Sequence, residues 1–377
     1  MMSEISRKSQ GTLADQVLPE LRRKVERMIL QLDGRSPHFT SDGIYDDMPL
    51  DWWTSGFWPG ILWVMYDLTK DEQYCKAAWD WDRRLEEFFI KENDFNHDVG
   101  FQFLPTAVMK YKLTGDRDGK RRGWLAASYL AGRFNMAGNF LRAWNQQDDM
   151  GLAIVDTAMN LSLLFWAGEE FGDPRFGHIA KAVVETLIRH FIREDGSVRH
   201  VVSFDPETGA FIESLGGQGY GPDSAWSRGQ AWALYGMANA YRYTGEIRYL
   251  RAAQRVAHFL IAALPENKVP YWDFRLPSNE GEPLDTSAAA CAASGLLEIA
   301  HQLPTVEGRI YYEWAVAILD SLTENFTTFT HPEYEGILTS GTGNKPKNWA
   351  VNVSLIYGDF FYVEGIAKLT GLLHPIF

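Results

Sequence analysis

The sequence predicts an all-α protein, an (α/α)6 barrel of six helical hairpins in one domain of residues 1–377. Two observations lead to this prediction: a helix–turn–helix phrase recurs along the chain, and one long apolar stretch carries a single carboxylate. Strand signals are few by comparison. With 46% hydrophobic and 14% aromatic residues, the chain can form a large core and is too rich in aromatic residues for disorder.

The recurring phrase is an apolar helix end, a short polar turn and then an amphipathic helix with small residues, which is typical of helical hairpins. It starts at Tyr66 (YDLTKDEQY), Tyr111, Gly168, Tyr241 and, in degraded form, His301, and a last fragment, AKLTG, ends at Gly371. The turns fall at positions 70, 115, 172, 245, about 305 and 371. This spacing is too irregular for a solenoid of identical units but suits a closed ring of inner and outer helices.

The apolar stretch covers residues 151–168, and Asp156 is the only ionisable residue between Leu152 and Trp166. A helix that is apolar all round is a buried helix. A buried carboxylate must be paired, neutralised or functional. We therefore expect an inner helix with Asp156 pointing into the central cavity and Asn160, four residues on, on the same face. A structural Asp156 that caps a neighbouring helix explains the pattern equally well.

The remaining elements follow in order. Residues 1–15 are polar, and we expect about this length to be flexible, before an amphipathic helix over residues 18–32. Residues 197–204 (SVRHVVSF), followed by Asp-Pro-Glu-Thr-Gly, predict one arm of a minor β-hairpin. We expect this hairpin and the other long loops at one mouth of the barrel.

Charge and cysteine content exclude several classes of protein. The net charge of −13 argues against non-specific binding to nucleic acid or to an anionic membrane. Cys75 and Cys291 are far apart and suggest neither a disulfide framework nor a zinc site. The N-terminal residues lack the apolar core of a signal peptide, and no run is long enough for a membrane span, so the simplest location is the cytoplasm.

Polar and aromatic residues that no core requires fall in the loops between hairpins. In residues 51–58 (DWWTSGFW) the tryptophans suit stacking on sugar faces, although Trp52 and Trp58 also read as ordinary packing. In residues 96–101 (NHDVGF), Asp98 is either a reactive carboxylate or the N-cap of the next helix.

Two further loops add candidate residues. His200 lies in the predicted hairpin, either at the cavity or as a surface or strand-packing imidazole. Residues 216–232 contain Gln218, Arg228 and Trp232, and an Arg on so apolar a helix is costly unless it meets a carboxylate, such as Asp223 or another acid. Nucleophile triads, phosphate loops and metal-type His spacing are not found in the sequence. Carboxylate chemistry in an aromatic-lined cavity remains, and carbohydrate is the natural substrate.

Several motifs together resemble the unsaturated glucuronyl hydrolases, glycoside hydrolase family 88, over essentially the full length. They are DWWTSGFWPGILW, NHDVGF, LFWAGEEFGDP, SFDPETG, residues 216–232 and VPYWDF. The resemblance implies an exo-acting enzyme that removes 4,5-unsaturated glucuronic acid from the non-reducing end of oligosaccharides produced by lyases. Such enzymes hydrate the C4=C5 vinyl ether, whereas ordinary glycosidases place two carboxylates around the anomeric carbon.

The resemblance also implies roles for individual residues. Asp156 would protonate C4 and activate water for C5, assisted by Asp98, and we expect burial and the second carboxylate to raise the pKa of Asp156. Arg228 would meet the uronate carboxylate. Trp53 and Trp232 would stack on the sugar, and His97, His200 and Gln218 would hydrogen-bond to hydroxyls or the attacking water. The remaining expected substrate contacts are Trp144 and Asn160. We expect no metal and no cofactor.

Residues 340–345 (SGTGNK) resemble a Ser-x-x-Ser-x-Lys pattern with which members of the family that act on sulfated disaccharides hold the sulfate. Gly343 replaces the second Ser, and a Ser, a Lys and free amides still suit an anion. A flexible basic loop is the alternative interpretation. Ser340 and Lys345 are therefore candidate sulfate ligands, and the preference for sulfated substrates stays open.

Three other functions are compatible with parts of this pattern. Unsaturated rhamnogalacturonyl hydrolases share the fold and both aspartates but match these loops less well. A sugar epimerase would need paired cavity histidines, for which only His97 and His200 are good candidates. A non-catalytic sugar-binding protein would have no reason to bury Asp156 beside a second acid. The expected partner is an unsaturated uronic-acid-containing di- or oligosaccharide, bound by a monomer or weak homodimer.

Overall fold

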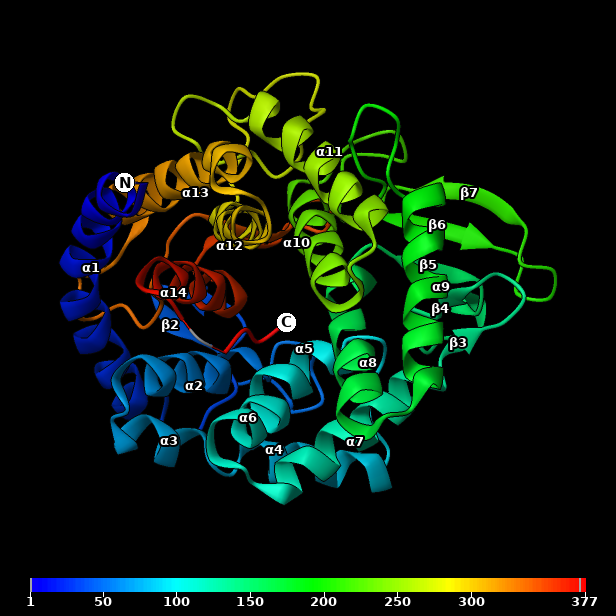
Figure 1. Cartoon of the computed structure of the whole chain (residues 1–377), viewed down its shortest axis with the longest axis horizontal. Coiled ribbons are helices and arrows are strands. Elements are labelled where there is room, and N and C mark those ends of the chain that lie inside the picture. Colours follow the sequence, from blue (N-terminus) through cyan, green and yellow to red (C-terminus); the bar gives the residue numbers. More distant parts are fainter. Residues whose placement is uncertain (1, 373) are drawn as a thin grey trace.

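A computed structural model describes residues 2–372 and 374–377, and helices arranged in a double ring dominate it (Figure 1). The inner ring consists of α2 (Phe57–Thr69), the α5–α6 segment (Val99–Phe103 and Met109–Thr114), α8 (Thr157–Phe171), α10 (Ser227–Thr244), α12 (Thr286–Gln302) and α14 (Ile356–Thr370). The outer ring consists of α1 (Met2–Leu32), α3 (Glu72–Ala78), α4 (Trp81–Glu86), α7 (Arg117–Ala131), α9 (Pro174–His190), α11 (Ile247–Ala263) and α13 (Thr305–Phe326). The predicted (α/α)6 barrel is confirmed.

The turns from inner to outer helices lie where the recurring phrase predicts them. Five inner helices end in a left-handed residue: Lys70 (φ 55°), Gly115 (73°), Gly172 (62°), Gly245 (68°) and Gly371 (91°). The degraded fifth copy differs, because α12 is followed by the extended Leu303 and by Pro304. Positive φ favours glycine at these positions, which explains why the sequence marks them.

The ring closes between the first and last helices, since α1 packs against α14 as its outer partner. The last copy of the phrase therefore has its second helix at the other end of the sequence. We expected residues 1–15 to be flexible. Residue 1 and the side chains of residues 2–12 lie outside the described residues, so the expectation stays a prediction for them. Leu13 and Ala14 are buried.

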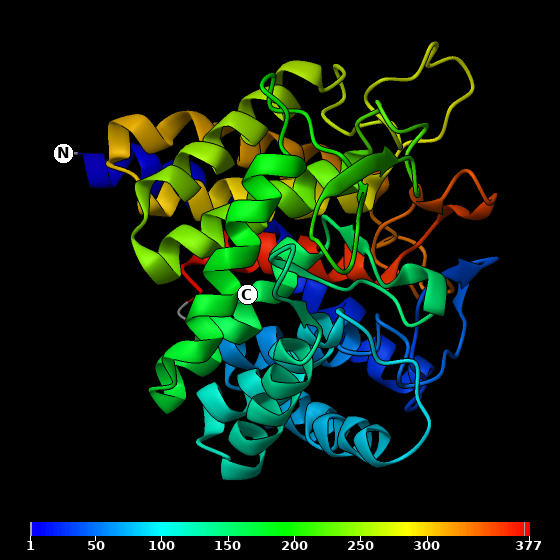
Figure 2. The same ribbon diagram turned by 90° about the vertical axis from the view of Figure 1, so that its right-hand side faces the viewer.

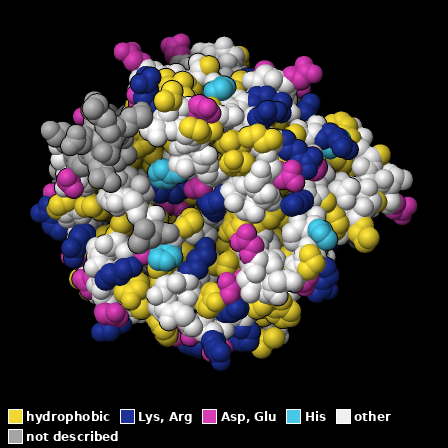
Figure 3. All heavy atoms as spheres, in the orientation of Figure 1, with side chains coloured by type: hydrophobic (Ala, Val, Ile, Leu, Met, Phe, Trp, Pro, Cys, Tyr) yellow, Lys and Arg dark blue, Asp and Glu magenta, His cyan; other side chains and the backbone are white. Residues whose placement is uncertain are grey.

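Inner helices all run in one direction, so their N-termini meet at one mouth of the barrel, where the hairpins and long loops gather (Figure 2). The opposite face is formed by the inner-to-outer turns, and Figure 3 shows acidic and basic side chains interspersed over it. None of the helices in the described ranges is long and apolar enough to cross a membrane.

Short antiparallel strands cover the mouth: β1 (Thr40–Ser41) with β2 (Ile44–Tyr45), β3 (Phe134–Asn135) with β4 (Phe140–Leu141), β5 (Leu152–Ile154) with β6 (Val201–Phe204) and β7 (Phe211–Leu215), and β8 (Gly341–Asn344) with β9 (Trp349–Val353). The hairpin arm predicted over residues 197–204 is present as β6, but the strand begins only at Val201. The helix predicted from Leu152 is wrong at its start, because Leu152–Ile154 pairs with β6. Tertiary pairing overrides a local pattern that is apolar in either conformation, and α8 begins only at Thr157.

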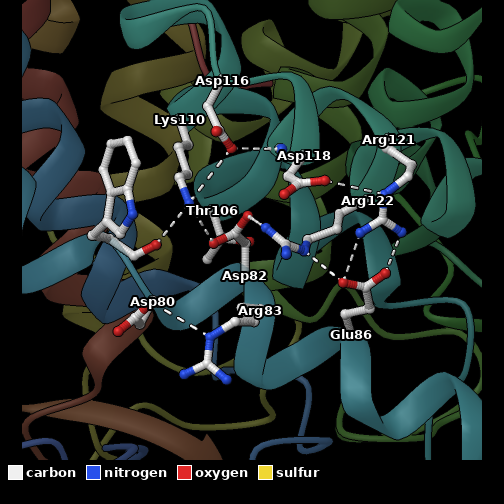
Figure 4. Close-up of polar contacts among 12 residues, drawn as sticks. Asp80, Asp82, Arg83, Glu86, Thr106, Lys110, Asp116, Asp118, Arg121 and Arg122 are labelled. Carbon is white, nitrogen blue, oxygen red and sulfur yellow. Dashed lines mark hydrogen bonds and ion pairs between the residues drawn. The ribbon is translucent and has the colours of Figure 1, made fainter.

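An ionic network fixes the outer helices α4 and α7 to the α5–α6 segment (Figure 4). Asp82 is 1% exposed and accepts from Arg122 Nη1 at 2.7 Å and from Lys110 Nζ at 3.2 Å. Arg122 Nε donates to Glu86 at 2.7 Å. Removing one partner would leave a buried charge without its counter-ion, which typically costs about 3–5 kcal/mol. The network therefore stabilises the wall that carries Asp98.

Candidate active site

A cavity of about 700 Å³ opens at the mouth of the barrel, a volume suited to a small ligand. Seven of the predicted site residues line it: Trp53, Asp98, Trp144, Asp156, His200, Gln218 and Arg228. They come from loops and helix starts far apart in the sequence, which the common direction of the inner helices brings together.

Asp156 stands at the N-cap position of α8, where it lines the cavity and is 8% exposed. Its side chain makes no capping hydrogen bond to α8. Oδ1 has no hydrogen-bond partner among the described residues and lies 3.5 Å from Nε2 of His200. The structural interpretation of Asp156 as a cap is therefore not supported, and its carboxylate is free to act on a ligand.

The neighbouring loop fixes the proton of His200. Nδ1 of His200 accepts the backbone N–H of Gln218 at 2.8 Å, so the neutral imidazole carries its proton on Nε2, which faces Asp156. Gly217 permits this approach, because its φ is +58° and a Cβ there would lie 2.2 Å from Nδ1. The ring of His200 also packs on Trp226 with centroids 4.3 Å apart.

Asp98 occupies the N-cap position of α5 without making a capping hydrogen bond. Instead, Oδ1 accepts from Asn160 Nδ2 at 3.1 Å, and Oδ2 lies 3.4 Å from Nε2 of His97. Asn160 Nδ2 also donates to the backbone oxygen of Asp156 at 3.2 Å, and Asn160 Oδ1 accepts from the Phe101 N–H at 2.8 Å. One amide thus connects both carboxyl-bearing helix starts.

Close packing of α5 on α8 makes this connection possible. A Cβ at Gly100 would lie 2.4 Å from Asn160 Oδ1 and 2.7 Å from Asn160 Cα. Only glycine allows the two helices to come this close. The NHDVGF motif therefore contains both the carboxylate, Asp98, and the glycine, Gly100, whose close packing lets Asn160 hydrogen-bond to that carboxylate.

The two carboxyl groups have opposite pKa shifts. Burial, and next the charge of Asp156, raise the pKa of Asp98 well above its usual range. Burial would also raise the pKa of Asp156, but the facing imidazole of His200, with a smaller contribution from His97, holds it below the usual value. A proton shared by the pair therefore resides on Asp98. Our expectation of a raised pKa for Asp156 is wrong for this structure, and the reason is the imidazole that faces it.

Arg228 is 2% exposed and meets an acid, as its burial requires, but the acid is Asp285 rather than Asp223. Nη1 donates to Asp285 Oδ2 and to the Thr342 carbonyl, each at 2.7 Å. Nη2 donates to Gln218 Oε1 at 2.8 Å and to the Gly343 carbonyl at 2.7 Å. Arg228 thereby fixes Gln218 and the β8 strand, while contact with a substrate carboxylate stays a prediction.

Five predicted contact residues lie outside the cavity wall. Trp232 is fully buried between Phe101 and Phe361, with ring centroids 5.1 and 5.3 Å away, so the expectation that it stacks on a sugar is wrong. The inward side of α10 is core at that depth. The other four are His97, Asn160, Ser340 and Lys345.

His97 and Asn160 are fully buried and act behind the carboxylates. Burial lowers the pKa of His97 to about 3, so its ring is neutral near pH 7. Ser340 immediately precedes β8, and Lys345 Nζ lies 4.0 Å from Glu282. Their role as sulfate ligands stays a prediction.

Sequence reasoning missed other parts of the wall. Trp226, Asn344, Lys347 and Trp349 line the cavity, and so do the carboxylates of Asp51, Asp94 and Asp149. Trp52, interpreted above as packing, lines it as well. Trp226 and Trp349 follow polar loops as Trp53 does, and that shared context was the available signal.

Comparison with known proteins gives a family match over most of the chain. The family model of Glycosyl Hydrolase Family 88 matches residues 22–331. The chain is 35% identical over 326 residues to the unsaturated glucuronyl hydrolase of Bacillus sp. (strain GL1), an alignment that covers 84% of this chain and 86% of that protein. It is 30% identical over 365 residues to the unsaturated chondroitin disaccharide hydrolase of Streptococcus agalactiae serotype III (strain NEM316), covering 93% and 91%.

The fold is shared as well. The crystal structure of the unsaturated glucuronyl hydrolase from Bacillus sp. GL1 matches with a TM-score of 0.92 and 32% identity, covering 95% of this chain and 97% of that one. The family match spans most of the chain and includes both buried aspartates and the cavity loops between them. The chain belongs to glycosyl hydrolase family 88.

Proposed function

We propose that this enzyme removes 4,5-unsaturated glucuronic acid from the non-reducing end of lyase-generated oligosaccharides of the glycosaminoglycan type. The observation that carries the proposal is the pair of buried carboxyl groups, Asp98 with a raised pKa and Asp156 with a lowered one, at one aromatic-lined cavity. The relatives support the substrate class: the Bacillus enzyme is described as responsible for the degradation of glycosaminoglycan, and the streptococcal protein as acting on chondroitin disaccharide.

The wall provides the two kinds of contact that a sugar needs. Trp53 and Trp144 offer ring faces, while Gln218 and the Nε2–H of His200 offer hydrogen bonds. Arg228 adds positive charge beneath Gln218, although its terminal nitrogens already donate to the protein. An anionic uronate therefore meets a partly compensated positive region on one side of the cavity.

Asp156 is the proposed acid and base. The carboxylate of the substrate, placed beside Asp156, disfavours a second negative charge there, so Asp156 takes up a proton from solvent as the substrate binds. Asp156 then gives this proton to C4 of the double bond, water adds its oxygen to C5, and the carboxylate accepts the proton released by that water. The product is a hemiketal at C5, whose opening breaks the C5–O5 bond, forms a ketone at C5 and leaves a hemiacetal at C1. Collapse of this hemiacetal forms the C1 aldehyde and breaks the C1–O bond, and the leaving sugar takes up the hydroxyl proton.

Asp98, His97 and Asn160 assist from behind. A protonated Asp98 donates a hydrogen bond to a sugar hydroxyl without adding a second negative charge next to Asp156. Asn160 keeps Asp98 and the start of α8 in register.

The test is the ultraviolet absorbance of an unsaturated chondroitin or hyaluronan disaccharide. Wild-type protein should remove the signal of the conjugated C4=C5 bond and release the amino sugar. Asp156→Asn is near-isosteric, so the protein should still fold, and kcat should fall by about 10²–10⁴-fold because the acid–base group is lost. No absorbance change on these substrates, but loss on rhamnogalacturonan fragments, would show that the leaving sugar is rhamnose instead.

Location and assembly are finer parts of the proposal. We place the enzyme in the cytoplasm, supported by two buried free cysteines, Cys75 and Cys291, as is usual in reducing compartments. We propose that it acts without metal, cofactor or nucleic acid, as a monomer or weak homodimer. Activity after dialysis against EDTA and the mass from light scattering test these points.

A further inference from the structure

His38 lies directly behind the aromatic wall of the cavity without lining it. It is 1% exposed, in the segment between α1 and β1. Its ring centroid is 5.8 Å from those of Trp52 and of Trp53 and 4.9 Å from that of Trp349, and all three tryptophans line the cavity. One imidazole therefore joins cavity residues from two segments almost 300 positions apart in the sequence.

Trp349 makes the closest of the three contacts to His38. Its indole is nearly parallel to the His38 ring, at 22°, and meets the edge of Phe39 with centroids 5.3 Å apart. The residue is 37% exposed on the β8–β9 hairpin, close in sequence to Lys347 at the mouth. His38 thus covers one face of the indole, and the part that remains open belongs to the cavity wall.

The nitrogens of His38 contribute little to this arrangement. Nδ1 lies 3.2 Å from Thr54 Oγ1, while the buried Nε2 has no hydrogen-bond partner in the described part of the chain. Burial, with a smaller contribution from Arg228, lowers the pKa of His38 to about 3, so the ring is uncharged at neutral pH. The aromatic ring itself, rather than a charge, makes the contacts to the tryptophans: it stacks on Trp349 and meets Trp52 and Trp53 in T-shaped contacts.

In an exo-acting enzyme the terminal sugar reaches Asp98 and Asp156, so the wall nearer the mouth faces the sugar that leaves. We infer that His38 is a positioning residue for this leaving-sugar side, where its ring stacks on Trp349 and holds Trp52 and Trp53 through T-shaped contacts. The inference rests on the proposed function. Because His38 touches neither the carboxyl pair nor the cavity, its loss should weaken binding and leave the chemical step nearly unchanged.

The experiment compares His38→Ala with His38→Phe, which keeps an aromatic ring and removes both nitrogens. KM and kcat are measured by loss of the double-bond absorbance on a disaccharide, together with the midpoint of urea unfolding. We expect His38→Ala to raise KM about tenfold, equivalent to about 1.4 kcal/mol, with kcat within about threefold of wild type. His38→Phe should restore KM to within about threefold.

Val256→Ala is the control for lost stability, since Val256 is fully buried on the outer helix α11. It should unfold at lower urea concentration and keep the wild-type KM. If His38→Ala does not fold, His38→Leu, which fills the site without a ring, replaces it. A folded ring-less variant with unchanged KM would overturn the inference, and so would a His38→Phe variant as impaired as His38→Ala. An inactive wild-type protein would instead refute the proposed function.

Discussion

Gly100→Ala tests how the carboxyl pair is assembled. The added Cβ would lie 2.4, 2.7 and 2.9 Å from Oδ1, Cα and Cβ of Asn160, whereas carbon atoms pack best at about 3.5–4.0 Å. Helices α5 and α8 must therefore separate by about 1 Å. Asn160 would then lose its geometry toward Asp98 and toward the Phe101 N–H.

The expected effect on the rate is larger than the effect on stability. Overpacking costs about 1–3 kcal/mol, and the better helix propensity of Ala returns about 1 kcal/mol, which leaves a net loss of about 0–2 kcal/mol. A displacement of about 1 Å at a reacting group can cost about 10²-fold in rate, equivalent to about 2.7 kcal/mol. We therefore expect kcat to fall about a hundredfold in a protein that still folds cooperatively.

The assay pairs disaccharide kinetics with urea unfolding, and Gly177→Ala is the matched control. Gly177 lies in α9, and a Cβ there would meet no atom within 4 Å. This control should gain about 0.4–1 kcal/mol of stability and keep its kcat. A Gly100→Ala enzyme with kcat within threefold of wild type would refute the reasoning that contact between α5 and α8 sets the position of Asp98.

Three other predictions concern charge. Lys347 lines the cavity, so Lys347→Ala should raise KM for a sulfated disaccharide about tenfold more than KM for an unsulfated one. Lys345 lies outside the cavity wall, and Lys345→Ala should not change this ratio. A larger effect of Lys345→Ala than of Lys347→Ala would instead support the sulfate motif predicted from the sequence. In the folded protein Asp98 has a raised pKa, whereas in the unfolded chain its pKa is that of an ordinary carboxyl group. The free energy of unfolding should therefore fall as the pH rises from the unfolded pKa to the folded pKa, because over this range only the folded state still holds the proton. Asp98→Asn should remove this part of the pH dependence in urea titrations between pH 4 and 8, and an unchanged profile would contradict the assigned protonation. Asp82→Asn should destabilise by about 3–5 kcal/mol in the same titration with unchanged KM, because it removes the buried counter-ion that Arg122 and Lys110 share. A loss below about 1 kcal/mol would show that the network is dispensable.

The architecture was predictable because the turns are local. A left-handed residue at the end of an inner helix needs Gly or a tolerant side chain, so Gly115, Gly172 and Gly245 mark the hairpins in the sequence itself. A second local signal placed Asp98 and Asp156 at the cavity: each carboxylate lies next to buried helix residues, where an unpaired charge is costly unless it has a function.

What the sequence could not supply depends on contacts between distant segments. Pairing of Leu152–Ile154 with β6 moved the start of α8, and the depth of Trp232 along α10 depends on how the rings of Phe101 and Phe361 fill the barrel. The proton distribution between Asp98 and Asp156 depends on His200, whose orientation is fixed by the backbone of Gln218. None of these contacts has a signature in residue spacing.

The common direction of the inner helices has an electrostatic consequence. Each helix carries roughly half a positive elementary charge at its N-terminus, because its first N–H groups are not used within the helix. The N-terminal ends of α2, α5, α8, α10, α12 and α14 all lie around the mouth. A chain with a net charge of −13 thus turns the positive ends of its backbone dipoles toward one opening, and an anionic sugar is attracted there by the peptide groups themselves.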